Sequence, residues 1–181
     1  MLTPPLNKSD HTQGNLQAPV ILVEYGDYEC PYCGQAYQVI KEIEKNFGKN
    51  LLFVFRNFPL SEIHPHALAA AYAAEAAGLQ GKFWQMHAML CTHQDALTKE
   101  DLRRYAKELS LNGEQFEDDL QSQTVQDKVY NDFQSGIESG VAGTPTFFVN
   151  GNKILRYSHS TLHEAIESTM RASAHQLYEQ Q

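Results

Sequence analysis

The chain has few cysteines, a deficit of basic residues and no long hydrophobic run, and each shortage excludes a class of protein. Three cysteines in 181 residues are too few, and odd in number, for a framework of structural disulfides. Fourteen basic and 22 acidic side chains give a net charge of -8. A nucleic-acid-binding protein is therefore not expected, because it needs a basic surface. No run approaches the ~18 apolar residues of a membrane span.

An export signal is also missing from the start of the sequence. Residues 1–17 are mostly polar and contain no apolar core of the kind that a secretory signal needs. We therefore expect a cytoplasmic protein, with a periplasmic or other extracytoplasmic location as the alternative if a signal has been removed. The length fits one domain. We expect a flexible N-terminal arm over residues 1–18 and a single domain over residues 19–181.

The first half of that domain has the pattern of a strand, a helix and a second strand. Residues 20–25 (VILVEY) are mostly apolar, β-branched or aromatic, which is typical of a buried strand. Residues 34–47 carry apolar side chains at steps of three and four, which predicts a helix. Residues 51–55 (LLFVF) predict a second buried strand. This order favours a parallel pair with a right-handed crossover.

A helical insertion at about residues 60–140 separates this unit from a second β-β-α unit. Residues 146–149 predict a strand, Asn150 and Gly151 a two-residue hairpin turn, and residues 153–157 the returning strand. A closing helix is expected over residues 161–178. The predicted fold is therefore α/β and thioredoxin-like, β-α-β … β-β-α, with a mixed four-stranded sheet and a helical insertion.

Two of the three cysteines, Cys30 and Cys33, lie between the first strand and its helix, in the sequence Cys-Pro-Tyr-Cys. At a helix start the first sulfur lies beside unpaired N–H groups and the positive end of the helix dipole. Both favour a thiolate, so the pKa of Cys30 should fall below its usual value. Pro31 suits the first helical position. Cys33, one turn further on, can close a disulfide with Cys30.

This pattern predicts thiol–disulfide exchange with protein thiols and a redox partner. Cys30 would form the mixed disulfide and Cys33 would resolve it, without a metal or an organic cofactor. One alternative is a metal-binding protein, in which Cys30 and Cys33 form half of a zinc site completed by nearby histidines. A second alternative is a redox-inactive chaperone that keeps the same fold.

Several separated motifs resemble the DsbA-like branch of the thioredoxin superfamily. The resemblance covers about residues 18–170. It lies in four segments of the sequence: EYGDYECPYC at 24–33, FPL followed by IHP at 58–65, FW at 83–84 and GTPTF at 143–147. Tyr32 departs from the histidine of the strongly oxidising members, which leaves the direction of the redox chemistry open among oxidase, reductase and isomerase.

The resemblance implies roles for residues outside the cysteine pair. The bond between Thr144 and Pro145 should be cis and should face the cysteines, with the backbone of Thr144 pairing with an extended substrate. Pro31 and Tyr32 join Thr144 as expected substrate-binding residues, and Pro145 joins the catalytic set. Glu24 is implied to be a buried acid that exchanges protons with the resolving thiol; a surface-facing Glu24 is the alternative.

Other chemically suggestive residues have simpler interpretations. Cys91 is expected to be a small buried apolar residue. His64 and His66 flank Pro65 and are interpreted as the boundary of a helix. The acidic run at residues 117–119 (EDD) is expected to face solvent.

Overall fold

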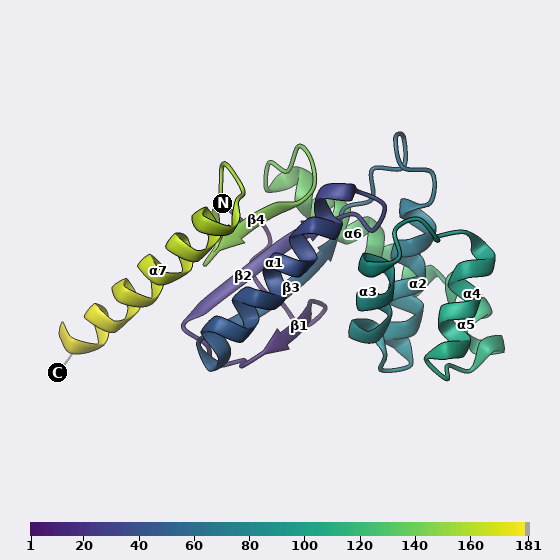
Figure 1. Ribbon diagram of the computed structural model, residues 1–181, viewed down its shortest axis with the longest axis horizontal. Coiled ribbons are helices and arrows are strands. Elements are labelled where there is room, and N and C mark those ends of the chain that lie inside the picture. Colours follow the sequence, from purple (N-terminus) through teal and green to yellow (C-terminus); the bar gives the residue numbers. More distant parts are fainter. Residues whose placement is uncertain (180–181) are drawn as a thin grey trace.

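A computed structural model describes residues 1–179 of the chain, with side chains up to Ser173 (Figure 1). Its centre is a mixed sheet of five strands in the order β1-β3-β2-β4-β5, in which β2 and β3 are parallel and the other pairs antiparallel. The strands are β1 His11–Gly14, β2 Val20–Gly26, β3 Leu51–Asn57, β4 Thr146–Val149 and β5 Asn152–Lys153. The predicted α/β thioredoxin-like fold is confirmed, with one strand more than expected.

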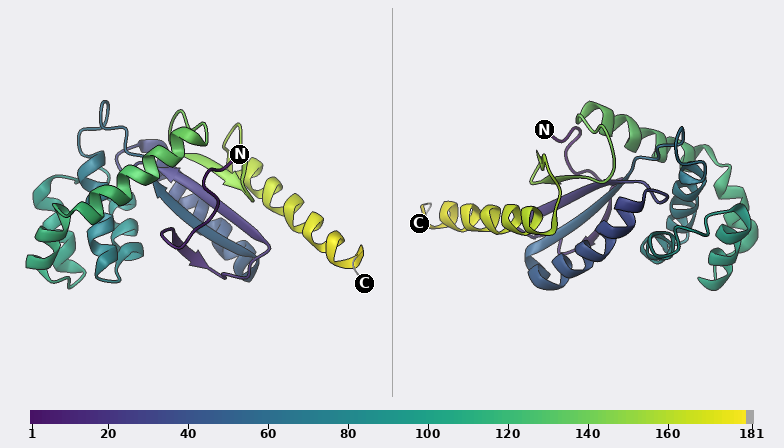
Figure 2. Two further views of the ribbon diagram at one scale, coloured as in Figure 1. Left: turned by 180° about the vertical axis from the view of Figure 1, so that it is seen from behind. Right: turned by 45° about the horizontal axis from the view of Figure 1, so that its top comes forward.

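The described helices are α1 to α7 and a short 3-10 turn, η1, Gly48–Asn50. Their bounds are α1 Pro31–Phe47, α2 Ala67–Leu79, α3 Phe83–Thr92, α4 Lys99–Glu108, α5 Gly113–Leu120, α6 Gln123–Glu138 and α7 His159–Glu179. Figures 1 and 2 show α2 to α5 as a cluster at one end of the sheet, while α7 projects from the other end. The end of the domain expected at residue 181 lies outside the described residues.

Alternation along β2 and β3 creates two apolar layers, one on each face of the sheet. Leu22 and Phe53 pack with Ile40 and Ile43 of α1 on the first face. Val23 and Val54 point to the second face, into a separate cluster with other buried side chains. That cluster includes Leu2, Tyr25, Leu52, Phe58, Val141 and Phe148. Both faces of the central strands are thus buried, as their apolar sequences predict.

The expectation of a flexible arm over residues 1–18 is wrong. Residues 11–14 form β1, which pairs with β3 along the edge of the sheet. Leu2 is buried in the second apolar layer. Asp10 forms an ion pair with Arg56 of β3, and both side chains are only 1% exposed. This segment therefore completes the domain, although its polar composition resembles that of a linker.

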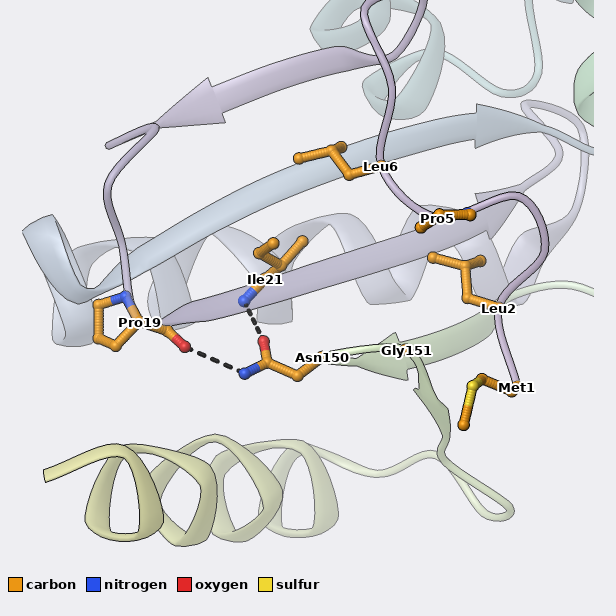
Figure 3. Close-up of a pocket in the computed structure, with 8 residues that line it drawn as sticks. All are labelled: Met1, Leu2, Pro5, Leu6, Pro19, Ile21, Asn150 and Gly151. Atoms are coloured by element: carbon orange, nitrogen blue, oxygen red, sulfur yellow. Dashed lines mark hydrogen bonds between the residues drawn. The ribbon is translucent and has the colours of Figure 1, made fainter. Parts of the chain in front are cut away.

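The turn between β4 and β5 follows the prediction, but the returning strand is shorter than residues 153–157. Asn150 and Gly151 both have positive φ, 44° and 81°, the backbone conformation that an Asn-Gly hairpin turn needs. The Asn150 side chain accepts a hydrogen bond from Ile21 N and donates one to Pro19 O (Figure 3). These bonds fasten the turn to the start of β2.

A pocket of about 400 Å³ lies where the N-terminal segment crosses this end of the sheet, and Figure 3 shows the residues that line it. Its lining includes Leu2, Leu6 and Ile21. Since Cys30 follows the carboxyl end of β2, the pocket lies at the opposite end of the strand from the cysteine pair.

Asp119 and Cys91 of the helical insertion are both buried, which contradicts one expectation and confirms another. Asp119, expected to face solvent, is 7% exposed and its Oδ1 accepts a hydrogen bond from Gln115. Cys91 is buried in the apolar core, as predicted.

Candidate active site

The cysteine pair lies where β2 passes into α1. Cys30 is the N-cap residue, with extended backbone, and Pro31 occupies the first turn. The Cys30 carbonyl accepts hydrogen bonds from the backbone N–H groups of Cys33 and Gly34, at 3.0 and 3.2 Å. The helix thus begins directly at the motif, three residues earlier than the sequence predicts. Pro31 costs no backbone hydrogen bond at this position.

The two thiols are unbonded, and both are almost completely buried. Cys30 Sγ lies 3.3 Å from the backbone oxygen of Thr144, to which the protonated thiol donates a hydrogen bond. The Thr144–Pro145 peptide bond is cis. The structure therefore brings the second half of the sequence to the first cysteine, across 114 residues. Tyr32, between the cysteines, is 66% exposed.

Several hydrogen-bond donors converge on the Cys30 sulfur and together lower its pKa to about 5. The largest contribution is the hydrogen bond from Cys33; burial opposes it, while Thr144 and the backbone N–H groups of Cys33 and Tyr32 lower the pKa further. Among the described side chains, the Thr144 hydroxyl is one of three buried polar groups without a hydrogen-bond partner. It is thus available to a thiolate. Cys30 is an anion at neutral pH.

Cys33 has the opposite character. Burial raises the pKa of its thiol well above the usual value, and the hydrogen bond to Cys30 and the negative charges of Glu24 and Cys30 raise it further. The backbone N–H of Asp27 lies 3.4 Å from its sulfur. The pair therefore consists of one exchange-ready thiolate and one protonated thiol.

Glu24 is buried, at 4% exposure, on the face of β2 that packs against α1. Burial raises the pKa of its carboxyl to about 8, and the charge of Cys30 contributes to the rise. The surface-facing alternative for Glu24 is therefore wrong. Its carboxyl is mostly protonated at neutral pH and lies close enough to Cys33 to affect the pKa of that thiol.

Sequence reasoning missed Asp27, the residue that connects the cysteine loop to the next loop. Its side chain is fully buried. Oδ1 accepts a hydrogen bond from the backbone of Glu29, and Oδ2 accepts one from the backbone of Leu60. Oδ2 also lies 2.7 Å from Nδ1 of His64. The motif at residues 58–65 was the available signal, but nothing in the sequence pairs it with Asp27.

Gln94, between α3 and α4, is a second residue that the sequence did not reveal. Its amide donates hydrogen bonds to the carbonyl oxygens of Tyr28 and Cys30, at 2.9 and 2.7 Å. A Cβ at Gly34 would lie 2.0 Å from Gln94 Oε1. Glycine at residue 34 therefore lets the helical insertion hold the cysteine loop in place.

Among the described residues, the histidines and the third cysteine do not combine with Cys30 and Cys33 into a metal-binding cluster. Cys91 lies 3.8 Å from His87, whose other ring nitrogen contacts Tyr28. His66 is exposed and precedes α2, in agreement with its interpretation as a helix boundary. Within the described residues, no three His, Cys, Asp or Glu side chains are arranged to hold a metal ion. The zinc alternative thus lacks the second half of its site there.

Adjacent, unbonded thiols at the start of α1 on a thioredoxin-like sheet define a site of the thiol–disulfide oxidoreductase class. A family model described as Thioredoxin matches residues 6–168. The chain therefore belongs to the thioredoxin family.

Solved structures resemble the chain over nearly its whole length. A thioredoxin-like oxidoreductase from Silicibacter pomeroyi DSS-3 is 26% identical, with a TM-score of 0.82 over 91% of this chain and 94% of that one. Oxidised BdbD from Bacillus subtilis is 27% identical, with a TM-score of 0.80 over the same shares. α-DsbA1 from Wolbachia pipientis, 23% identical, has the same fold, with a TM-score of 0.80 over 96% of each chain. The neighbours are DsbA-like oxidoreductases.

The curated relatives that the chain matches are named Na(+)/H(+) antiporters. A Na(+)/H(+) antiporter NhaA 1 from Salinispora arenicola is 46% identical over 144 residues, which are 80% of this chain and 22% of the relative. NhaA from Herminiimonas arsenicoxydans is 39% identical over 96% of this chain and 28% of its own length. The chain thus spans about a quarter of the relatives it matches. Among the described residues, no helix is long and apolar enough to cross a membrane.

Proposed function

We propose that the chain is a DsbA-like protein disulfide oxidoreductase that works mainly in the oxidising direction, donating its Cys30–Cys33 disulfide to protein thiols. The observation that carries this direction is the position of Cys30 at the N-cap of α1, where hydrogen bonds from Cys33, Thr144 and the backbone lower its pKa to about 5, against 9.0 for an ordinary thiol. At pH 7 this difference stabilises the reduced form by roughly 3 kcal/mol, which corresponds to a potential more oxidising by about 60 mV.

The reaction begins when a substrate thiolate attacks Cys30 Sγ of the oxidised pair. The Cys30–Cys33 bond breaks, and Cys33 leaves with the bonding electrons and takes up a proton. A second substrate thiolate then attacks the substrate sulfur of the mixed disulfide and releases Cys30 as a thiolate. Two electrons pass from the substrate to the pair, and a redox partner must reoxidise it.

Glu24 supports the proton transfer in this scheme. With a pKa of about 8, its carboxyl carries a proton near neutral pH beside the thiol that needs one. It acts as the proton relay for Cys33. No charged donor is needed, because the neutral acid is the form that its buried position favours.

Substrate binding is assigned to the surface beside Cys30. The backbone of Thr144 pairs with an extended substrate segment, and Pro145 keeps that strand facing the sulfur. Pro31 and Tyr32 are exposed at the start of α1 and contact the substrate beside the mixed disulfide. The compartment belongs to the same proposal. Nothing in the comparisons supports the cytoplasmic expectation, so we assign an extracytoplasmic location, where oxidising chemistry persists.

Equilibration in glutathione redox buffers tests the direction. The Cys30–Cys33 couple, quantified by thiol labelling and mass, should have a potential between about -120 and -200 mV. A potential near -270 mV, in the range of thioredoxin, would contradict the oxidase assignment. A Cys33→Ser variant, whose Cys30 thiolate can still attack a disulfide but cannot resolve the product, should accumulate mixed disulfides with disulfide-containing protein substrates, and Cys30→Ser should form none.

The same variants separate the alternatives. A redox-inactive chaperone would bind clients equally well after the double substitution Cys30→Ser, Cys33→Ser. A zinc protein would be isolated with bound metal, and the Cys33→Ser variant would contain less of it. The oxidoreductase proposal expects loss of disulfide exchange in the double variant and no dependence on added zinc.

A further inference from the structure

His64 lies beside the active site and has no role in the mechanism described so far. Its Nδ1 is 2.7 Å from Asp27 Oδ2, and its side chain is 18% exposed. Asp27 in turn donates its backbone N–H to Cys33 Sγ and accepts the backbone N–H of Cys30 through its carbonyl. A single buried carboxylate residue therefore contacts His64 on one side and both cysteines on the other.

The backbone holds His64 in place independently of that ion pair. Its N–H donates to Leu60 O at 2.9 Å, and Leu60 N donates to Asp27 Oδ2. The next loop residues are also tied to the cysteine loop, because His66 N donates to Glu29 Oε2. Two contacts thus join the residues before α2 to those before α1, and the imidazole lies at the junction.

The charges that face His64 are all negative. They are Asp27 and Glu29 from the loop after β2, and the Cys30 thiolate at the start of α1. Burial alone would lower the pKa of the imidazole, but the hydrogen bond to Asp27 and the charges of Asp27, Cys30 and Glu29 raise it overall. The cation is therefore the favoured partner for this group of acids.

We propose that His64 is a positioning residue of the dithiol site: as an imidazolium bonded to Asp27, it stabilises the Cys30 thiolate and takes up a proton when the pair is reduced. The inference rests on the proposed function, in which reduction leaves an anion at Cys30. When the disulfide forms again, that anion is gone, and His64 releases the proton to solvent. The coupling is reciprocal, so the protonated histidine also favours the thiolate.

A substitution that removes the positive charge tests whether His64 stabilises the Cys30 thiolate. His64→Gln keeps a donor for Asp27 and removes the cation, so the thiolate fraction of Cys30 at pH 4.5 should fall about three- to tenfold. Absorbance at 240 nm and the rate of iodoacetamide alkylation measure it. His64→Lys should restore most of the thiolate, because it returns a positive charge. His66→Gln, an exposed neighbour whose side chain makes no contact with the site, is the matched control and should leave the titration unchanged.

Titration of His64, followed through its ring protons by NMR, tests whether it takes up a proton when the cysteine pair is reduced. The pKa of His64 should be higher in the reduced protein than in the oxidised protein, and Cys30→Ser should match the oxidised value. Equal values in all three would overturn the coupling, as would a His64→Gln protein with the wild-type Cys30 titration and an unchanged melting temperature. If the cysteines form no reversible disulfide, the proposed function fails. The difference in the pKa of His64 between the reduced protein and Cys30→Ser still measures the coupling between His64 and the Cys30 thiolate.

Discussion

Adjacent residues of β2 carry buried polar groups to opposite faces of the sheet, and the two faces treat them differently. Tyr25 points to the face where Arg56 and Asp10 form a buried, bidentate ion pair, with Arg56 also donating to the Tyr25 hydroxyl at 2.9 Å. Glu24 points to the other face, where burial and a thiolate raise the pKa of its carboxyl to about 8. On the first face the charged groups are paired with each other, whereas on the second face the carboxyl is held in its neutral form.

Two adjacent residues of β2 thus lie beside groups with different roles: an ion pair that stabilises the fold and a carboxyl that can exchange protons. A buried ion pair with full hydrogen bonding fixes the N-terminal segment but leaves no group able to exchange protons near neutral pH. A carboxyl held neutral near two cysteines costs stability whenever it ionises, yet it is available as a proton source. The reactive groups of the chain accordingly lie on the α1 face.

Breaking the ion pair should have the largest effect on stability. Arg56→Met leaves the Asp10 carboxylate buried without its partner, which should lower the free energy of unfolding by about 3–5 kcal/mol. Urea denaturation measures the loss. Arg103→Met, which breaks the exposed pair between Arg103 and Glu117, should cost far less, because solvent screens exposed ion pairs and they contribute little to stability. Similar losses in both variants would show that the buried pair does not fix the N-terminal segment.

Removing the charge of Glu24 should have a smaller effect of opposite sign that depends on pH. The pKa of the Glu24 carboxyl is about 8 in the folded protein, against 4.5 for an ordinary glutamate. Between these two values the folded protein keeps a proton that the unfolded chain has lost, so this residue lowers stability as pH rises through the window. Glu24→Gln should therefore stabilise the reduced protein on the order of 3 kcal/mol at pH 8 and change little at pH 4.

Urea denaturation at both pH values measures this gain, with Glu62→Gln as the exposed control. An equal change at pH 4 and pH 8 would mean that the carboxyl is not held protonated by its burial. Slower release of Cys33 from the disulfide in Glu24→Gln is the kinetic counterpart of the same substitution.

The smallest effect should come from the Gln94 contact, which positions the cysteine loop from outside both faces. Gln94→Ala removes two hydrogen bonds and should cost about 1–2 kcal/mol. Gly34→Ala forces the Gln94 side chain away and should cost a similar amount. The double variant should cost no more than either single one, because both remove the same contact. Additive losses would contradict the shared contact.

The parts of this structure that the sequence predicted are local or strongly patterned. The strand, the cysteine motif and the amphipathic helix are consecutive, so β2, α1 and the thiol pair could be placed from residues 20–47. Asp27 and His64 are 37 residues apart, and Asp10 and Arg56 are 46 apart. Such pairs have no period or motif, and only the folded chain brings them together.

The misplaced N-terminal arm has a similar physical cause. β1 (HTQG) lies at the edge of the sheet, where its polar residues are half-buried or exposed and no apolar alternation is required. The strand is held by backbone pairing to β3, which composition does not reveal. The fifth strand and the covering of the second sheet face were therefore invisible in the sequence, while the buried strands were plain.

The titration of Cys30 is the most direct test of the proposed oxidising direction. Absorbance at 240 nm, followed from pH 3 to pH 10 in the reduced protein and corrected with Cys30→Ser, reports its thiolate. We expect a midpoint near pH 5, set by hydrogen bonds from Cys33, Thr144 and the start of α1. A midpoint near 9.0, the pKa of an ordinary thiol, would contradict this prediction, because the oxidising direction depends on a stabilised thiolate.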